Sequence, residues 1–337
     1  MHNIFKSDVS VYFDLFLVYI FIHLSVCSSI DDGNCIAPPL ECPNKNITFW
    51  LYTRANRDKP HELKFSEPKS IDMAPWVPNA PIKIIIHGYT GDRNYSPNKE
   101  IRPAYLECCD YNIIAVDYNP IAREPCYVEA AFNTELIGKC SAQLIDEIVF
   151  NHGIDLSRIH VIGFSLGAHI GGFIASNIKS GRLERLTGLD PALPFFATVN
   201  VTRKIDPSDG KLVDILHTNA LQKGKLEISG HVDFFANGGM TQPGCKADAD
   251  LTKSGCEHAR APAYFAESIT TQVGFYGTKC YSWIAYILGW CDIVGSDEDV
   301  LFGEYMPKNA SGLYFFNTNA EPPYSRGRNN KTTSMII

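Results

Sequence analysis

The chain has 337 residues, of which 45% are hydrophobic and 20% are charged, so it can bury a full core and is neither disordered nor fibrous. The formal net charge is −7 and the basic residues are scattered, which excludes a nucleic-acid-binding surface. The length fits one large domain, and no linker or repeat divides it.

The first 28 residues have the pattern of a secretory signal peptide. An apolar stretch over residues 15–26 ends in small residues and then aspartates. A membrane anchor is the alternative, but Asp14 and His23 leave the stretch shorter than the roughly 20 residues that span a bilayer. We therefore expect a secreted, extracellular protein. Five sequons fit a glycosylated exported chain, at Asn46, Asn94, Asn200, Asn309 and Asn330.

The cysteine content agrees with an oxidising compartment. There are 11 cysteines, and removal of the signal peptide would leave an even number. Zinc-type spacing is not found among them, so no metal site is predicted. Connectivity does not follow from sequence alone. Spacing suggests local pairs, Cys126 with Cys140, Cys245 with Cys256 and Cys280 with Cys291, leaving Cys35, Cys42, Cys108 and Cys109 to tie the amino-terminal segment to the sheet.

From residue 81 onward, short apolar runs alternate with longer helical patterns. The runs are rich in isoleucine and valine at consecutive positions, as expected for strands that helices cover on both faces. Helical spacing of apolar residues predicts a helix over residues 133–150. The pattern predicts an α/β fold with a central, mostly parallel sheet flanked by helices. The expected strands cover residues 82–86, 113–116, 159–162, 185–189 and 212–217.

Residues 163–167 read Gly-Phe-Ser-Leu-Gly and match the G-x-S-x-G motif. They lie between the expected strand 159–162 and a helical pattern over residues 168–178, and in this context the motif predicts a sharp strand-to-helix turn. The turn would present the hydroxyl of Ser165 as a nucleophile, and glycines flank it because side chains would clash there. A serine alone is a poor nucleophile, so a base and a carboxylate should follow it in the chain.

Asp190 is the best candidate for the carboxylate, because it follows an apolar run at the carboxyl end of a strand, at the same sheet edge as Ser165. The alternative is a turn aspartate, since aspartate before proline is common in turns. Three histidines remain open as the base, His217, His231 and His258. All three follow Asp190 in loop-rich sequence, and spacing does not choose among them.

Acyl transfer to a serine nucleophile would also need two backbone N–H donors for the oxyanion. Leu166, directly after the serine, would supply the first. The second would come from the N–H of Tyr89, because the strand over residues 82–86 runs into His87 and Gly88, and glycine allows close backbone approach. The alternative is a simple strand-ending turn.

These residues resemble the pancreatic-type lipase family, which includes animal triacylglycerol lipases, insect relatives and the phospholipases A1 of wasp venom. The resemblance implies an α/β-hydrolase fold without a cofactor. The family places its base just beyond the second cysteine of a lid loop, which matches Cys256 and favours His258, so the resemblance implies a triad of Ser165, Asp190 and His258 and a lid disulfide between Cys245 and Cys256. The likeness covers roughly residues 42–319 and rests on residues 86–89, 163–169, 187–192, 206–209, 213–218, 230–235 and 237–239.

Departures from the family pattern refine the expectation. The lipase domain would cover residues 29–324, and residues 325–337 are expected to form a flexible tail, which leaves no room for the carboxyl-terminal β-sandwich of many members. At two positions of the family's calcium site this chain has Val201 and Lys204 instead of an acid and an arginine. A metal is therefore not expected.

Two shortened loops bear on the substrate. The lid loop holds 10 residues between Cys245 and Cys256, and the segment over residues 218–230 is also short. Both features resemble the phospholipase A1 members. The expected function is release of fatty acid from phospholipid at a membrane or emulsion interface, by a monomer. Triacylglycerol hydrolysis is the alternative, and a non-catalytic lipid-binding or yolk-type protein is the rival from another class.

The segment from Cys280 to Cys291 is unusually rich in bulky apolar residues for a loop closed by cysteines. Tryptophan and tyrosine favour the boundary between water and acyl chains, which suggests a contact with lipid. Burial in the core is the alternative, because large aromatic residues are mostly buried.

Overall fold

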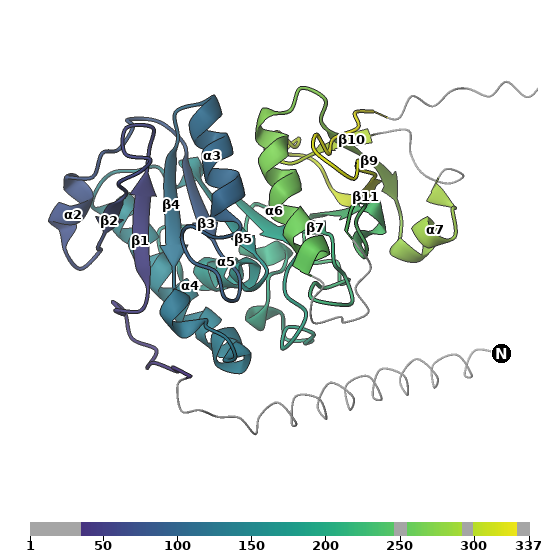
Figure 1. Cartoon of the computed structure of the whole chain (residues 1–337). Helices are drawn as coiled ribbons and strands as arrows, with labels where there is room; N and C mark the ends of the chain where they lie inside the picture. Colours follow the sequence, from purple (N-terminus) through teal and green to yellow (C-terminus); the bar gives the residue numbers. More distant parts are fainter. Residues whose placement is uncertain (1–34, 246–254, 292–298, 329–337) are drawn as a thin grey trace, which may run out of the picture. The chain divides into compact units, whose positions relative to one another are not determined.

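The computed structural model describes residues 35–245, 255–291 and 299–328 (Figure 1). The expected signal peptide lies outside the described residues. The chain divides into two units, residues 1–36 and 37–337. Among the described residues, no helix combines the length and the hydrophobicity that crossing a membrane requires.

A mixed sheet of 11 strands forms the centre of the described part of the second unit. The strands are β1 (Thr48–Tyr52), β2 (His61–Leu63), β3 (Ile82–Ile86), β4 (Asn112–Asp117), β5 (Ile159–Phe164), β6 (Arg185–Leu189), β7 (Leu212–His217), β8 (Val232–Ala236), β9 (Phe275–Cys280), β10 (Asp299–Phe302) and β11 (Gly312–Phe316). Their order is β10-β9-β11-β8-β7-β6-β5-β3-β4-β1-β2. The neighbours from β4 to β11 in this order pair in parallel, and antiparallel strands flank them on both sides. The expected α/β class is confirmed, and each of the five expected strands is present.

Helices pack on both faces of this sheet (Figure 1). They are α2 (Pro68–Asp72), α3 (Asn98–Cys108), α4 (Tyr127–Phe150), α5 (Leu166–Asn177), α6 (Gly255–Thr270) and α7 (Trp283–Ile287), with short 3-10 turns η1 (Asn119–Ile121), η2 (Leu156–Arg158), η3 (Val201–Arg203), η4 (Pro207–Asp209) and η5 (Asn237–Gly239). Helix α4 begins at Tyr127, earlier than the expected start at residue 133. Its first turns expose Val128 and Phe132 to solvent, which hid the amphipathic pattern.

The sheet separates two hydrophobic cores. Ile84 and Ile86 of β3 point into the core that α4 and α5 cover, while Ile85 points into the core beneath α3 and α6. Successive residues of a strand face opposite sides, so a run of isoleucines fills both cores at once. The sheet is thus held between two helical layers, which makes its carboxyl edge a rigid platform.

The disulfides of the described residues include Cys42–Cys140, Cys245–Cys256 and Cys280–Cys291. The last two confirm the expected local pairs, but the expected pair of Cys126 and Cys140 is wrong. Cys126 caps the amino end of α4 and Cys140 lies within it, about 20 Å further along the axis, whereas bridged Cα atoms lie within roughly 7 Å. Cys108 and Cys109 are free thiols, so the expectation that they anchor the amino-terminal segment is also wrong.

Packing contacts extend past residue 324, where the tail was expected to begin. The backbone N–H of Ser325 donates to Oε1 of Glu267 at 2.7 Å, and Gly327 forms a bridge with Phe275. Residues 329–337 lie outside the described part of the chain.

Candidate active site

Ser165 occupies the sharp turn between β5 and α5. Its φ of 56° and ψ of −118° lie outside the regions that side chains favour, and such strain concentrates at functional sites. A Cβ on Gly163 would lie 2.1 Å from the carbonyl oxygen of Gly167, and a Cβ on Gly167 would lie 2.4 Å from that of Ile86. Strand and helix therefore approach so closely that glycine is required at both positions.

Asp190 directly follows β6, the strand beside β5, and its side chain is fully buried. Its Oδ1 accepts hydrogen bonds from the backbone N–H groups of Thr218 at 2.8 Å and Asn219 at 3.0 Å. A Cβ on Gly224 would lie 2.4 Å from the same oxygen, so this glycine makes room for the carboxylate. These contacts hold one carboxylate oxygen and leave Oδ2 for another partner.

His258 is that partner, since its Nδ1 lies 2.6 Å from Oδ2 of Asp190. A carboxylate can only accept, so Nδ1 carries the proton and Nε2 is the basic nitrogen. The imidazole also packs on the ring of Phe164, with 4.5 Å between ring centroids. Because Phe164 immediately precedes Ser165, this contact fixes the histidine beside the serine turn. His258 lies in the first turns of α6, two residues after the disulfide-bonded Cys256.

The other two candidate bases have different partners. His217 is fully buried; its Nδ1 donates to the carbonyl oxygen of Lys225 at 2.7 Å, and its Nε2 lies 2.9 Å from Oδ1 of Asp233. The Nδ1 of His231 accepts the backbone N–H of Val213 at 3.0 Å. Both nitrogens of His217 are thus engaged in structural bonds, and the histidine that meets Asp190 is His258.

The loop after β3 lies directly against the serine. A Cβ on Gly88 would come within 2.8 Å of the Cβ of Ser165, so close approach of this backbone explains the glycine. Tyr89, the expected second oxyanion donor, comes next in this loop. Leu166, the expected first donor, is the first residue of α5, where helix N–H groups lack intrahelical acceptors and carry partial positive charge.

Two histidines that sequence reasoning left without a role brace the loops around the serine. The Nδ1 of His87 donates to the carbonyl oxygen of Gly88 at 2.7 Å, and its Nε2 accepts the backbone N–H of Tyr118 at 3.2 Å. His169 in α5 donates to the carbonyl oxygen of Ala192, just beyond Asp190, at 2.9 Å and accepts the backbone N–H of Ile205 at 3.2 Å. The signal in the sequence that could have identified both residues is a histidine close to each glycine-containing motif.

These bonding patterns need neutral imidazoles, each with one donor and one acceptor nitrogen. Burial lowers the pKa of His87 and lowers that of His169 far below its usual value. Burial also lowers the pKa of His160 well below the usual value; its Nδ1 accepts from Nζ of Lys83 at 3.2 Å and its Nε2 donates to Thr187 at 2.8 Å. All three rings stay neutral where an exposed histidine would gain a proton.

We therefore expect the free energy of unfolding to fall as the pH drops below about 6.5, the unfolded-chain pKa of histidine. Below that pH the histidines of the unfolded chain bind protons, whereas the three buried rings stay neutral. This difference lowers the free energy of unfolding by about 1.4 kcal/mol per histidine per pH unit. Asp209 partly opposes this loss of stability. Burial raises its pKa to about 7, so the native state binds a proton at Asp209 at a higher pH than the unfolded chain does. Guanidinium unfolding at pH 7.5 and 5.5 measures the net loss, expected to be about 2–3 kcal/mol. Equal stability at both values would contradict the assignment.

The calcium site that the family resemblance suggested does not fit the residues present. The Nζ of Lys204 donates to Oε1 of Glu227 at 2.6 Å, so a cation already occupies this region. Asp206 and Asp209 form a capping box, in which the side chain of Asp209 accepts the backbone N–H of Asp206 and the side chain of Asp206 accepts a backbone N–H of the same turn. The pKa of Asp209 is raised, which disfavours the charged carboxylate that a metal would need.

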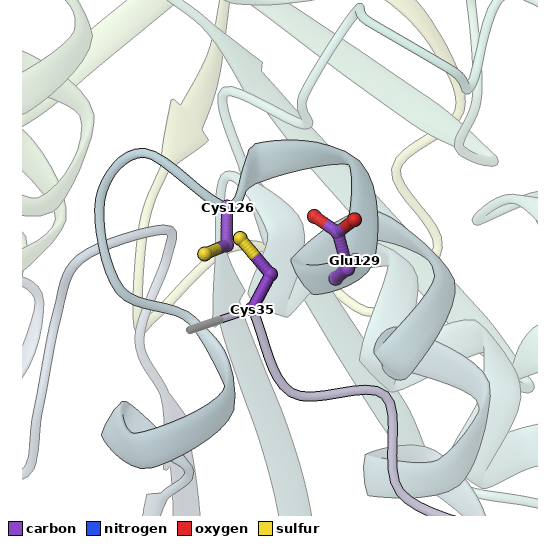
Figure 2. A group of neighbouring side chains, drawn as sticks. All are labelled: Cys35, Cys126 and Glu129. Atoms are coloured by element: carbon purple, nitrogen blue, oxygen red, sulfur yellow. The ribbon is translucent and has the colours of Figure 1, made fainter. Parts of the chain in front are cut away.

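A second group with metal-type side chains lies at the amino end of α4, where Figure 2 shows Cys126 and Glu129. Cys126 and Cys35 are both disulfide-bonded. A metal binds the thiolate of cysteine, so disulfide sulfurs are unsuitable ligands and this group is not a metal site.

A serine at a strained strand-to-helix turn, with a histidine–aspartate pair at the same edge of a mostly parallel sheet, defines the α/β-hydrolase fold. The model of the family named Lipase matches residues 32–324. The chain belongs to this family.

Relatives at about 30% identity include enzymes and a protein named as inactive. Pancreatic triacylglycerol lipase of Mus musculus is 32% identical over 317 residues, covering 86% of this chain and 67% of its own. Inactive pancreatic lipase-related protein 1 of Homo sapiens is 31% identical over 305 residues, covering 83% and 65%. Lipase member H-A of Xenopus laevis is 32% identical over 301 residues, covering 83% and 63%. The chain thus spans about two thirds of these relatives' length.

Among solved structures, an acetyl xylan esterase from Aspergillus awamori matches 57% of this chain and 73% of its own, with 13% sequence identity and a TM-score of 0.35. A likeness this weak carries no argument about activity.

Proposed function

We propose that the protein is a secreted hydrolase of lipid carboxylic esters that works by acyl transfer through Ser165, His258 and Asp190. The observation that carries the proposal is the hydrogen bond between Nδ1 of His258 and Asp190 beside the strained Ser165 turn. A structural serine would need neither the strain nor a neighbouring histidine whose basic nitrogen is left over. The disulfides of the described residues suit export to an oxidising compartment.

In the proposed mechanism, Nε2 of His258 takes the proton of the Ser165 hydroxyl while the oxygen attacks the ester carbonyl. Backbone N–H groups of Tyr89 and Leu166 stabilise the oxyanion. Asp190 holds the imidazole in its orientation and stabilises the imidazolium. The proton then passes to the departing alcohol oxygen, and water repeats the sequence on the acyl-enzyme to release the fatty acid.

A row of aromatic rings beside the serine supports a lipid acyl chain as the group that is transferred. Tyr89 packs edge-on against Tyr127 with 5.0 Å between ring centroids, and Phe195 lies 6.1 Å from Tyr127 and 6.0 Å from Phe132. Phe132 and Phe195 are 56% and 43% exposed. Such a row, which starts at the proposed oxyanion donor and ends at the surface, suits an alkyl chain and offers little to a polar substrate.

Phospholipid is the proposed substrate class, because the lid loop closed by Cys245 and Cys256, at a sequence separation of 11, is short, as in the phospholipase A1 members that the chain resembles. Triacylglycerol is the second candidate, since the relative from Mus musculus is named a triacylglycerol lipase. The two differ in the bulk and polarity of the group beside the scissile ester.

The test is hydrolysis of phosphatidylcholine and triolein, side by side, by the purified secreted protein. We expect fatty acid from phosphatidylcholine at about tenfold or more the rate from triolein, in keeping with the 10–200-fold discrimination that shape differences in a pocket provide. A fluorophosphonate probe should label Ser165, identified by peptide mass. Faster release from triolein would reverse the substrate assignment, and folded protein that is not labelled would favour a non-catalytic lipid-binding protein.

A further inference from the structure

The loop closed by Cys280 and Cys291 presents a cluster of apolar side chains to solvent. The Cα atoms of the two bridged cysteines are 5.1 Å apart, and no acidic or basic residue lies between these cysteines in the sequence. Five large side chains in this loop are 48–65% exposed. We call this cluster the apolar face; it consists of Tyr281, Ile284, Ile287, Leu288 and Trp290.

The exposure of the apolar face does not come from a loose loop, because other residues of the same loop anchor it. The Nε1 of Trp283 donates to the carbonyl oxygen of Gly238 at 3.0 Å. The ring of Tyr286 stacks on Phe315, with 4.2 Å between centroids and 9° between planes. Ser282 caps α7 by accepting the N–H of Ala285 at 3.0 Å. Burial in the core is therefore met only in part, since Trp283 and Tyr286 are half-buried while the five side chains of the apolar face are exposed.

The anchors also connect the loop to the edge of the sheet at which Ser165 lies. The loop leaves β9 at Cys280, which pairs with Leu313 of β11, and α7 then packs against η5, which directly follows β8. Because β8, β7, β6 and β5 are parallel, η5 and Ser165 both follow the carboxyl ends of their strands. The apolar face is therefore carried by an anchored element that reaches the same edge of the sheet as Ser165, three strands away from β5.

We propose that the apolar face inserts into the surface of a phosphatidylcholine aggregate and holds the protein there. The inference rests on the proposed function, since continuity with an ester site at the same edge is one of its arguments. A face without charge matches a zwitterionic surface, and its mixture of tryptophan, tyrosine and aliphatic side chains is typical of the water–acyl boundary.

The area of the apolar face argues against a second copy of the chain as its occupant. Five side chains of this size, each about half exposed, present roughly 500 Å² in total. A stable dimer interface buries about 800 Å² on each partner. Partial insertion into lipid has no such threshold, because each buried methylene contributes on its own.

The test measures binding to large unilamellar vesicles of phosphatidylcholine by sedimentation. All proteins carry Ser165→Ala so that lipid is not consumed. We expect Ile284→Ser combined with Trp290→Ser to weaken vesicle binding by about tenfold or more. The matched control is Phe150→Ser, which removes a side chain that is 60% exposed at the far end of α4 and should leave binding unchanged. Ile287→Ser alone provides a second, milder variant, expected to weaken binding in the same direction.

Vesicle binding that stays unchanged in the double variant would overturn the proposal, provided that the near-UV circular dichroism spectrum shows the variant to be folded. So would a dimer of the unsubstituted chain that dissociates in the double variant, since a second copy would then be the occupant. With Ser165 retained, the double variant should hydrolyse the soluble ester p-nitrophenyl butyrate at the unsubstituted rate. Failure of the unsubstituted chain on this ester would refute the proposed hydrolysis, while the vesicle measurement still decides the apolar face.

Discussion

Replacing Ser165 by alanine is expected to lower kcat for ester hydrolysis by about a million-fold, as for other triad serines. The change removes one oxygen at the turn between β5 and α5, and alanine meets the same backbone demand as serine there. Activity on p-nitrophenyl butyrate, with fluorophosphonate labelling beside it, measures the loss.

The control for this variant is its free energy of unfolding, which should equal or exceed that of the unsubstituted chain. Functional strain in the backbone stays, but the buried hydroxyl, which belongs to a side chain only 7% exposed, is gone. A variant that folds and retains more than about a hundredth of the activity would remove Ser165 from the mechanism, because acyl transfer cannot proceed at that rate without its nucleophile.

Asp190→Asn is expected to lower kcat by about ten-thousand-fold with little change in KM. The amide oxygen of asparagine can still accept the N–H groups of Thr218 and Asn219. Its NH₂ group must then face Nδ1 of His258, where the carboxylate oxygen now lies at 2.6 Å. The imidazole of His258 can accept a hydrogen bond from this NH₂ group only if its own proton lies on Nε2. A protonated Nε2 cannot take the proton of the serine.

A matched control exists in the second buried histidine–aspartate pair. Asp233→Asn alters the contact of His217, whose Nε2 lies 2.9 Å from Oδ1 of Asp233, by the same chemical change. We expect this variant to be less stable by about 1–3 kcal/mol yet to keep kcat within about tenfold. Equal losses of kcat in the two variants would mean that general destabilisation, and not the tautomer of His258, explains the effect of Asp190→Asn.

Local patterns in the sequence predicted the elements that position the site. The strand 159–162, the glycines around Ser165 and the helix after it were readable together, because a strand, a tight turn and a helix each depend on neighbours within a few residues. Helix α4 was the partial miss, since its exposed Val128 and Phe132 broke the amphipathic pattern at its start.

The lid disulfide and the loop disulfide were also predictable, because each joins residues 11 apart. The pairing of Cys140 was not, since its partner Cys42 is 98 residues away and about four turns of α4 separate it from the nearer candidate Cys126. Distance along a helix is invisible to a rule based on sequence spacing.

The sequence by itself determined the α/β class, the turn at Ser165 and the place of Asp190 at the end of a strand, because hydrophobic period and glycine position report local backbone geometry. Only the tertiary structure decided which histidine meets Asp190 and which side of the loop 280–291 faces solvent. His258 and Asp190 are 68 residues apart, and their contact exists because α6 packs with α3 on one face of the sheet and brings His258, in its first turns, to the residue after β6. Long-range contacts depend on how the layers pack, which no short stretch of the chain encodes.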